Sequence, residues 1–160
     1  MKYFLLTGML LVAGTAYAQL PDFELRDLQN RSQSYEDVKG SKVTLIDFWA
    51  TWCAPCIEAI PELIALQSRY KEQGLEVIGI NIDSQRNLSK VRPFVNSFGI
   101  NYTILLDPDS EVMPMMQLSV MPTVLVVDSH TNNIINVYEG YRPGVAAFIE
   151  EDIKKILDDE

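Results

Sequence analysis

The stretch "IDFWATWCAPCIEAIPEL", residues 46–63, contains both cysteines of the chain, Cys53 and Cys56. Residues 43–48, which lead into it, are apolar or β-branched except for Asp47, and such a run is typical of a buried central strand. After the second cysteine, apolar residues recur at helical spacing. The two cysteines are therefore predicted to lie where a central strand ends and a long helix begins.

Two thiols this close can form either a structural staple or a redox switch. A disulfide that closes so short a loop stabilises a fold by about 2 kcal/mol, against roughly 3 kcal/mol for a 15-residue loop, so the pair is a weak staple. Cys53 precedes the helix, where backbone N–H groups and the helix dipole favour the reactive thiolate. Pro55 suits the first helical turn and directs Cys56 back towards Cys53, which allows a mixed disulfide to be resolved within the chain.

Other cysteine chemistries fit the chain less well. A structural zinc site requires four ligands, whereas the sequence has two cysteines and one distant histidine, His130. A Cys-His hydrolase requires a histidine oriented on the thiol, and His130 falls in a predicted turn. Peroxide-reducing proteins of a similar fold carry a P-x-x-x-T-x-x-C pattern, but Ile46 stands where the proline would be. Thiol-disulfide exchange is the favoured interpretation.

The N-terminus has the pattern of a secretory signal. Lys2 precedes an apolar run over residues 3–12, and small residues end in an A-x-A site at Ala18. The alternative is a retained anchor, although the run is shorter than the ~20 residues that a spanning helix needs. We expect residues 1–18 to be a signal peptide and residues 19–160 a single domain, exported to the periplasm or the extracytoplasmic side of a bacterial membrane.

Composition limits the classes of partner. The 160 residues are 48% hydrophobic and 22% charged, which is typical of one soluble globular domain. The formal net charge of -9 disfavours nucleic acid and anionic lipid as partners, because both are repelled at long range. The sequence shows no coiled-coil pattern, and we expect a monomer.

Strands and helices are predicted to alternate along the chain. Strands are expected at residues 22–26, 43–48, 75–82, 102–107, 123–128 and 134–140, and helices at 56–73, 87–99, 109–118 and from 143 to 157. This order predicts an α/β fold, a mixed sheet with parallel core strands, an antiparallel edge hairpin and helices on both faces.

Two segments give the chain a family resemblance. "TLIDFWATWCAPC" (residues 44–56) and "VMPTVLVVD" (residues 120–128) resemble the thioredoxin superfamily. Residues 20–156 as a whole resemble its exported TlpA/ResA branch, which inserts a strand and a helix where this chain has residues 75–107. The combination of W-C-x-x-C, Pro61 after it and a later Pro-Thr pair is more specific than C-x-x-C alone. The resemblance implies a thioredoxin-like fold.

The resemblance also implies roles for individual residues. Cys53 would be the attacking thiol, Cys56 the resolving thiol, and Pro122 a cis-proline packed against their disulfide. Met121 would present backbone groups to an extended substrate chain. The substrate contacts expected are Trp52, Ala54, Pro55, Met121 and Pro122. The cysteine pair is itself the redox group, and no further cofactor or metal is expected.

Asp47 stands where thioredoxins carry a buried acid. Burial would raise its pKa, so that it could pass a proton to or from Cys56. The alternative is an aspartate at the strand edge that only bonds backbone. Glu58 is expected on a solvent-facing helix surface. The indoles of Trp49 and Trp52 are expected to pack around the active-site loop, and of the two Trp52 is expected to cover the disulfide and contact substrate.

The direction of the reaction is predicted from the groups around the thiols. Ala54 and Pro55 offer no cation to the thiolate, while Asp47 and Glu58 add negative charge, and a less stabilised reduced form is a stronger reductant. The expected function is an exported reductase of protein disulfides, apocytochrome c among them, that a membrane-bound thiol donor keeps reduced. Three alternatives stay open: an oxidase or isomerase, a non-catalytic binding module, and a copper-binding or metal-delivery protein. The copper ligands would come from Met113, Met115, Met116 and Met121.

Overall fold

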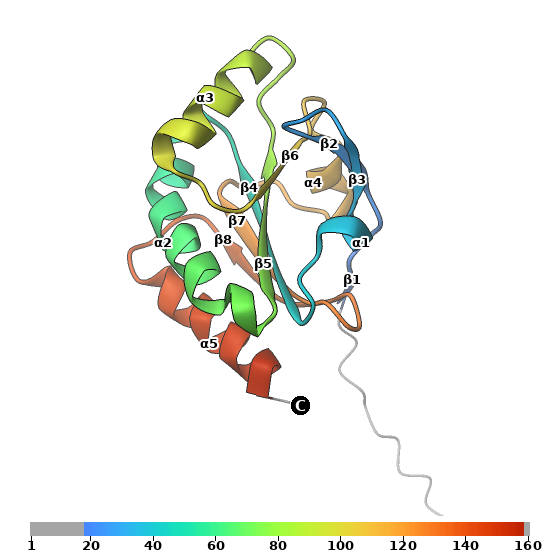
Figure 1. Cartoon of the computed structure of the whole chain (residues 1–160), viewed down its shortest axis with the longest axis vertical. Helices are drawn as coiled ribbons and strands as arrows, with labels where there is room; N and C mark the ends of the chain where they lie inside the picture. Colours follow the sequence, from blue (N-terminus) through green and yellow to red (C-terminus); the bar gives the residue numbers. More distant parts are fainter. Residues whose placement is uncertain (1–17, 159–160) are drawn as a thin grey trace, which may run out of the picture.

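The computed structural model of the chain describes residues 18–158 (Figure 1). The predicted signal segment lies outside these residues except for Ala18. The strands are β1 (Ala18–Gln19), β2 (Glu24–Asp27), β3 (Ser32–Ser34), β4 (Val43–Trp49), β5 (Leu75–Asn81), β6 (Thr103–Leu106), β7 (Thr123–Asp128) and β8 (Asn133–Glu139). The helices are α1 (Tyr35–Val38), α2 (Ala54–Tyr70), α3 (Leu88–Phe98), α4 (Val112–Met115) and α5 (Val145–Asp158), and a 3-10 turn, η1 (Lys71–Gln73), follows α2. In residues 18–158, no helix has the length and apolar character needed to span a membrane.

The strands form one eight-stranded sheet in the order β1-β8-β7-β4-β5-β6-β2-β3. The central strands β4, β5 and β6 pair in parallel, and β7 and β8 continue the sheet antiparallel beyond β4, as the order of elements predicts. The antiparallel edge hairpin is therefore confirmed, and the structure adds a second antiparallel edge that was not predicted, because β2 and β3 pair antiparallel beyond β6. These two strands are short and mostly polar, so their sequence carries no pattern that places them in the sheet.

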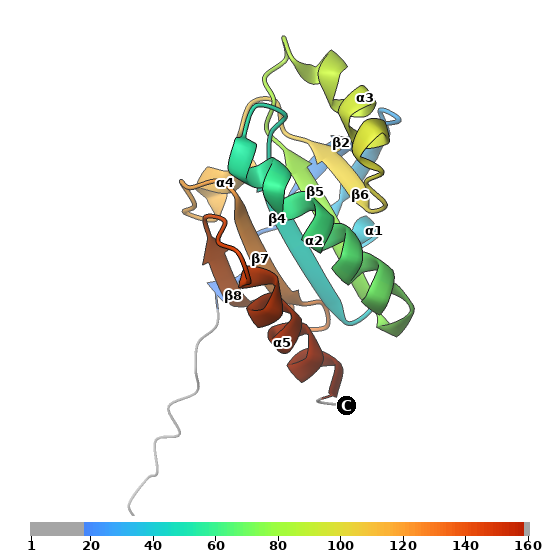
Figure 2. The same cartoon turned by 90° about the vertical axis from the view of Figure 1, so that its left-hand side faces the viewer.

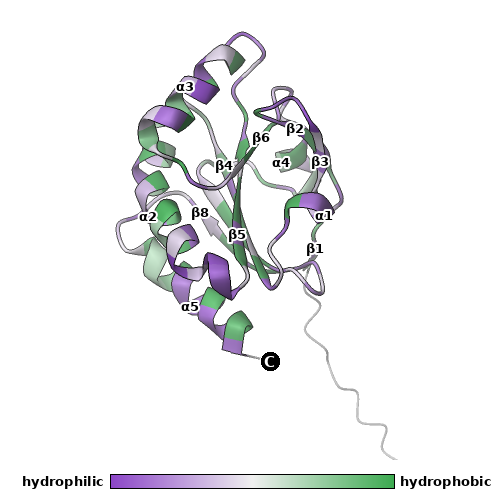
Figure 3. Ribbon diagram, in the orientation of Figure 1, coloured by the Kyte–Doolittle hydropathy of each residue, from purple (hydrophilic) through white to green (hydrophobic). Residues whose placement is uncertain are grey.

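Helices cover both faces of the sheet, as predicted. Helices α2, α3 and α5 lie on one face, and α1 and α4 lie on the other (Figures 1 and 2). Each face has its own apolar core cluster of buried side chains. The central strands are largely hydrophobic, whereas the outer helices mix hydrophobic and hydrophilic residues (Figure 3). This division is typical of a sheet that is buried on both sides.

Strand β4 is buried along its whole length. Leu45 and Trp49 belong to the core beneath α2, α3 and α5, whereas Ile46 and Phe48 belong to the core beneath α1 and α4. Because side chains alternate along a strand, Asp47 faces the same side as Leu45 and Trp49. The strand thus places one carboxyl group under the helix that carries the cysteines.

Helix α2 and the 3-10 turn η1 together cover the helix predicted at residues 56–73, but α2 starts two residues earlier and ends at Tyr70. It begins at Ala54, and the turn that follows it ends at Gly74, which adopts a left-handed φ of 109°. Helix α3 begins at Leu88, one residue after the predicted start. Pro93 is its sixth residue and lies inside the helix, beyond the first turn that best tolerates proline.

The predicted helix at residues 109–118 is a single turn, α4. Before it, the carboxylate of Asp107 accepts hydrogen bonds from the N–H groups of Glu111 and Val112 at 3.0 Å each. After it, Gln117 takes a left-handed φ of 58°. The Asp107 turn and the left-handed residue confine the helix on its two sides, although the apolar spacing alone suggests a longer one.

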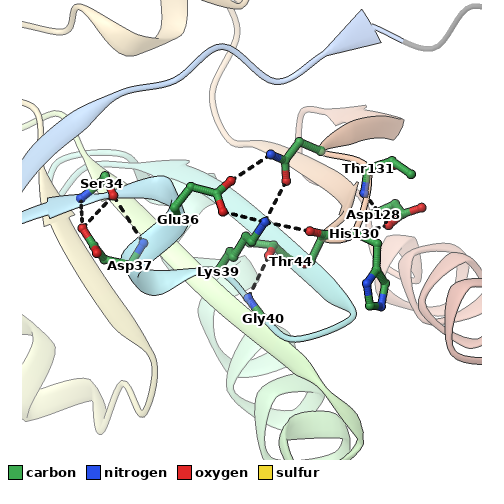
Figure 4. Close-up of polar contacts among 11 residues, drawn as sticks. Ser34, Glu36, Asp37, Lys39, Gly40, Thr44, Asp128, His130 and Thr131 are labelled. Carbon is green, nitrogen blue, oxygen red and sulfur yellow. Dashed lines mark hydrogen bonds and ion pairs between the residues drawn. The ribbon is translucent and has the colours of Figure 1, made fainter.

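A network of polar side chains holds the end of β4 that lies away from the cysteines (Figure 4). The Lys39 ammonium donates to the carbonyl oxygen of Ser129 at 2.9 Å and to the side-chain oxygen of Asn132 at 3.2 Å. The Thr44 hydroxyl accepts from the N–H of Gly40 at 3.0 Å and lies 2.8 Å from the Ser129 hydroxyl. These bonds tie the loop before β4 to the hairpin between β7 and β8.

Candidate active site

Cys53 and Cys56 form a disulfide, and their Cα atoms lie 5.3 Å apart. Cys53 directly precedes α2 and Cys56 lies in its first turn, as the sequence predicts. The pair is located where the central strand β4 leads into α2, at one end of the sheet (Figure 2). Cys56 is fully buried, whereas Cys53 is 6% exposed. Of the two residues, Cys53 is therefore the one that another molecule can approach.

Cys53 is the N-cap residue of α2. Its Sγ accepts a hydrogen bond from the backbone N–H of Cys56 at 3.3 Å. Its own N–H donates to the carbonyl of Ala50, and its carbonyl accepts from Ile57, both at 3.1 Å. The free N–H groups and the dipole of this 17-residue helix favour negative charge on the Cys53 sulfur once the disulfide is reduced.

The residues on either side of Cys53 are exposed. Trp52 is 61% exposed, so much of its side chain is open to contact with another molecule. Ala54 and Pro55 are exposed as well. Trp49, by contrast, is fully buried, and its ring centroid lies 5.4 Å from that of Phe94 in α3. An exposed Trp-Cys-Ala-Pro surface is suited to contact with another molecule.

The peptide bond between Met121 and Pro122 is cis. The carbonyl of Pro122 accepts a hydrogen bond from the N–H of Gly140 at 2.7 Å, which fixes this loop to the end of β8. Pro122 lines a small apolar cavity together with Ala59 and Leu63 of α2, so it lies against the first half of the helix that carries the cysteines. Met121 is half-buried and contacts both core clusters.

Asp47 is the one acidic residue of β4, and it is 1% exposed. Within residues 18–158, neither carboxyl oxygen has a hydrogen-bond partner. Burial raises the pKa of Asp47 to about 7, because the charged form loses its hydration and gains no compensating bond. This confirms the predicted direction, and the alternative of an aspartate that bonds backbone at a strand edge is wrong.

A polar group that the sequence analysis missed supports the loop before Cys53. The wholly buried carboxylate of Asp83 accepts hydrogen bonds from the N–H of Thr51 at 2.7 Å and from its hydroxyl at 2.8 Å. The side-chain amide of Asn81 donates to the same carboxylate at 2.9 Å. The available signal was the polar pair at the end of β5, since the carboxyl ends of parallel strands meet at one edge.

The remaining residues named in the sequence analysis, Glu58 and three methionines, differ in their exposure. Glu58 is exposed, as predicted. Met113 is buried in a core cluster, whereas Met115 is 50% exposed. Met116 is half-buried against the same cluster as Met113. Among the described residues, no group of three or more His, Cys, Asp or Glu side chains could hold a metal ion.

Residues 17–136 match the AhpC/TSA family. The chain belongs to the AhpC/TSA family. Among its relatives, the thiol-disulfide oxidoreductase ResA of Geobacillus thermodenitrificans is 30% identical over 138 residues, which cover 86% of this chain and 74% of that protein. ResA of Bacillus subtilis is 30% identical over 120 residues, and these cover 75% of this chain but only 65% of the relative's own length.

Solved structures similar to this chain support a thioredoxin-like fold. A protein of Chlorobium tepidum described as a thiol:disulfide interchange protein DsbE has a TM-score of 0.80 and 26% identity, covering 88% of this chain and 96% of that one. A thioredoxin of Neisseria meningitidis has a TM-score of 0.74 and 27% identity, with coverage of 88% and 91%. The fold is thioredoxin-like, and the chain is a homologue of thiol-disulfide oxidoreductases with a C-x-x-C disulfide of the ResA and DsbE type.

Proposed function

We propose that this protein reduces disulfides of other exported proteins by dithiol exchange at Cys53 and Cys56. The observation that carries the proposal is the disulfide between a slightly exposed Cys53 at the N-terminus of α2 and a fully buried Cys56 one turn later. This arrangement gives the two sulfurs different tasks. The Cys53 sulfur attacks the substrate disulfide, and the Cys56 sulfur attacks Cys53 within the chain.

The exchange follows from the positions of the two thiols. In the reduced protein, the Cys53 thiolate attacks one sulfur of the substrate disulfide, forms a mixed disulfide and releases the other substrate sulfur as a thiolate. The Cys56 thiolate then attacks the Sγ of Cys53, which restores the disulfide of this structure and releases the second substrate thiolate. Two electrons pass to the substrate, and its two thiolates take up protons from water.

Asp47 is the proton acceptor for Cys56 in the second step. Cys56 is fully buried and must lose its proton before it attacks, and Asp47 faces the core cluster to which Cys56 belongs. Because the pKa of Asp47 is raised to about 7, its charged form becomes available as the pH rises through neutrality. The resolution rate is expected to rise over the same pH range.

The reducing direction rests on the charges near the thiols. Ala54 and Pro55, the residues between the cysteines, bring no positive charge to the Cys53 thiolate. Asp47 is wholly buried and makes no hydrogen bond to any described residue, so its charged form adds a negative potential that disfavours the thiolate. A destabilised reduced form is the stronger electron donor. An oxidase or isomerase is the alternative within the same chemistry.

The proposed substrate contacts come from the surface beside Cys53, and the proposed compartment comes from the expected signal segment. Trp52, Ala54 and Pro55 offer an exposed surface beside Cys53. Met121, which precedes the cis-proline Pro122, offers backbone groups to an extended chain. We place the protein on the extracytoplasmic side of a bacterial membrane after removal of residues 1–18. A membrane-bound thiol donor then returns the pair to the dithiol, and apocytochrome c is one substrate with a C-x-x-C disulfide to reduce.

A trapping experiment tests the exchange and identifies the substrate. Cys56→Ser leaves Cys53 able to attack but removes the resolving thiol, so mixed disulfides with exported proteins should accumulate. Cys53→Ser is the matched control, because it keeps one thiol but places it where substrates have no access. Non-reducing gels and mass spectrometry of each variant give the readout. Equal trapping by both variants, or trapping by neither, would contradict the proposal.

A measured potential tests the direction. Equilibration of the purified protein with dithiothreitol buffers should give a reduction potential near that of thioredoxin, about -270 mV, or lower. A value near that of a strong oxidant, about -120 mV, would establish the oxidase alternative while leaving the exchange chemistry in place. N-terminal sequencing of the exported protein tests cleavage after Ala18.

A further inference from the structure

Helix α3 and the segments on either side of it differ in charge from the rest of the chain. Residues 84–106 contain three basic residues, Arg86, Lys90 and Arg92, and no acidic residue. The whole chain has a formal net charge of -9, so the residues outside this stretch together carry -12. Charges interact mainly within the screening length, about 10 Å at 0.1 M salt, so a group that approaches α3 meets a positive surface on an otherwise acidic protein.

The basic residues of this stretch face solvent. Arg86, Lys90 and Arg92 are exposed, whereas Val91 and Val95 of α3 are buried, so the helix packs through its apolar side. Within residues 18–158, the three cationic side chains form no ion pair. Five other basic side chains are paired with Asp or Glu: Arg31, Lys39, Arg69, Lys154 and Lys155. The charges of α3 are therefore available to another molecule.

The basic stretch begins close to the loop that carries Cys53. The carboxylate of Asp83 accepts hydrogen bonds from the N–H and the hydroxyl of Thr51, at 2.7 and 2.8 Å. Arg86 follows Asp83 by three residues, and Cys53 follows Thr51 by two, while a chain spans at most about 3.6 Å per residue. In both views, α3 and the start of α2 lie at the same end of the molecule (Figures 1 and 2). An extended polypeptide of about eight residues is long enough to reach from Cys53 to Arg86.

A surface groove of about 520 Å³ borders the start of α3. Its apolar lining residues are Leu25, Leu88, Leu106 and Pro108. The groove also contains one basic and one acidic side chain, and each has a polar neighbour: Arg26 donates to the carbonyl of Asn30, and Glu24 accepts from the hydroxyl of Ser32. The groove itself is thus neutral in balance, and it gives an extended chain a place to lie beside the cations of α3.

We infer that the exposed face of α3 is a docking surface for an acidic segment of the substrate polypeptide, within a few residues of the disulfide that Cys53 attacks. The inference rests on the proposed function and adds the charge of the preferred substrate. Carboxylates of the segment pair with Arg86, Lys90 and Arg92. Charge pairs at an exposed surface act mainly on the rate of encounter, so they raise kcat/KM for acidic substrates.

An anionic membrane is the other surface that these cations could meet, and the observations favour the polypeptide. Segments that bind anionic lipid contain about four to eight basic residues, whereas the exposed face of α3 has three. A membrane is also larger than the protein, so the acidic remainder of the chain would face it and be repelled. A short polypeptide segment on α3 interacts mainly with charges inside the screening length of about 10 Å, where the cations of α3 are.

The test compares two disulfide-bonded peptides of equal length, in which the same C-x-x-C pair is flanked by aspartates or by asparagines. At low salt, the natural protein should reduce the aspartate peptide with a kcat/KM about tenfold higher. This preference should shrink as salt is added, since the screening length falls from about 10 Å at 0.1 M to about 3 Å at 1 M. The α3 variant, which combines Arg86→Gln, Lys90→Gln and Arg92→Gln, should lose the preference.

The matched control combines Lys71→Gln, Lys154→Gln and Lys155→Gln, which remove the same number of positive charges far from the disulfide. Lys71 follows the last residue of α2, a helix of 17 residues that is about 25 Å long. Lys154 shares the carboxylate of Glu150 with Arg69, which lies near the same end of α2. The control should keep the preference for the aspartate peptide. An equal loss in both variants would show that net charge sets the preference, and it would overturn the inference.

A binding measurement separates the inference from the proposed function, because it requires no turnover. In fluorescence anisotropy, labelled peptides with serines in place of the cysteines should show tighter binding of the aspartate peptide to the natural protein than to the α3 variant. If they do and neither disulfide peptide is reduced, the docking surface stands and the reductase falls. Equal binding of the two peptides by the natural protein would overturn the inference. In that case, binding to vesicles of anionic lipid that the α3 variant loses would assign the helix to a membrane instead.

Discussion

The buried polar side chains at the two ends of strand β4 differ in their hydrogen bonding. At the start of the strand, Thr44 is bonded to Gly40 and Ser129, and Lys39 closes the same network. Three residues further on, Asp47 is equally buried and has no partner among the described residues. Satisfied polar groups stabilise and fix a structure, whereas an unsatisfied carboxyl stores free energy that shifts its pKa into the working range.

The difference indicates a division of labour along one strand. The end near Thr44 anchors the sheet to its loops, and the end near the cysteines keeps a reactive proton acceptor. Changes at the two ends should therefore separate stability from exchange activity. Four substitutions test this division, from the largest expected effect on the free energy of unfolding to the smallest.

Asp47→Asn should produce the largest change. A carboxyl whose pKa rises on folding from 3.8 to about 7 contributes fully to stability below pH 3.8, and the contribution is lost as the pH rises to about 7. The loss amounts to about 4 kcal/mol over this range, because each pKa unit is worth about 1.4 kcal/mol. The variant has no such dependence, so its stability relative to the natural protein should increase between pH 4 and pH 8.

Denaturant unfolding of both oxidised proteins at the two pH values measures this gain. The same substitution should slow resolution of the mixed disulfide and remove the rise of its rate near pH 7. A constant stability difference between pH 4 and pH 8 would mean that Asp47 is not a buried acid with a raised pKa.

Asp83→Ala should cost about 3 kcal/mol, because it leaves the N–H and hydroxyl of Thr51 without their acceptor. Thr51 lies two residues before Cys53, so the exchange rate should fall as well. Asp27→Ala is the matched control: Asp27 is also a buried carboxylate with backbone donors, from Gln29 and Arg31, but it lies at the end of β2. We expect the control to lose stability while its exchange rate stays unchanged.

Thr44→Val should cost about 2 kcal/mol, because the N–H of Gly40 and the hydroxyl of Ser129 lose their buried partner. The shape of the side chain is nearly conserved, so no cavity adds to this cost. Chemical denaturation measures the loss. The reduction potential and the rate of disulfide exchange should equal those of the natural protein, and a change in either would break the division between the two ends.

Lys39→Met should have the smallest effect, about 1 kcal/mol, since the lysine side chain is 22% exposed and its ion-pair partner Glu36 is 56% exposed, so water already shares in solvating the pair. The loss should shrink as salt is added, because the charge pair with Glu36 is screened. A loss larger than that of Thr44→Val would show that the charge, rather than the buried hydroxyl, anchors this end.

Local pattern was sufficient for much of the fold. The continuous apolar run before the cysteines identified β4 as central, because a strand that is buried on both faces is apolar at successive positions. The spacing of apolar residues after the cysteines identified α2, because a helix that is buried on one face repeats them every three or four residues. The sequence-based predictions of secondary structure and sheet topology are incomplete where side-chain hydrogen bonds or distant strands, rather than the apolar spacing, determine the structure. The helix at residues 109–118 is limited to α4 by Asp107 and Gln117, and the edge pairing of β2 with β6 depends on strands far apart in the sequence.

The sequence by itself determined the chemistry at Cys53 and Cys56, because their spacing, the proline between them and the strand-helix boundary are all local features. Tertiary structure alone decided the surroundings that tune this chemistry. Asp83, after β5, supports Thr51, after β4, and Trp49 and Tyr102 pack beside Gly79 of β5. The exposure of Trp52 likewise depends on how the chain packs around it. Such contacts depend on register and packing across the sheet, and no period within one segment encodes them.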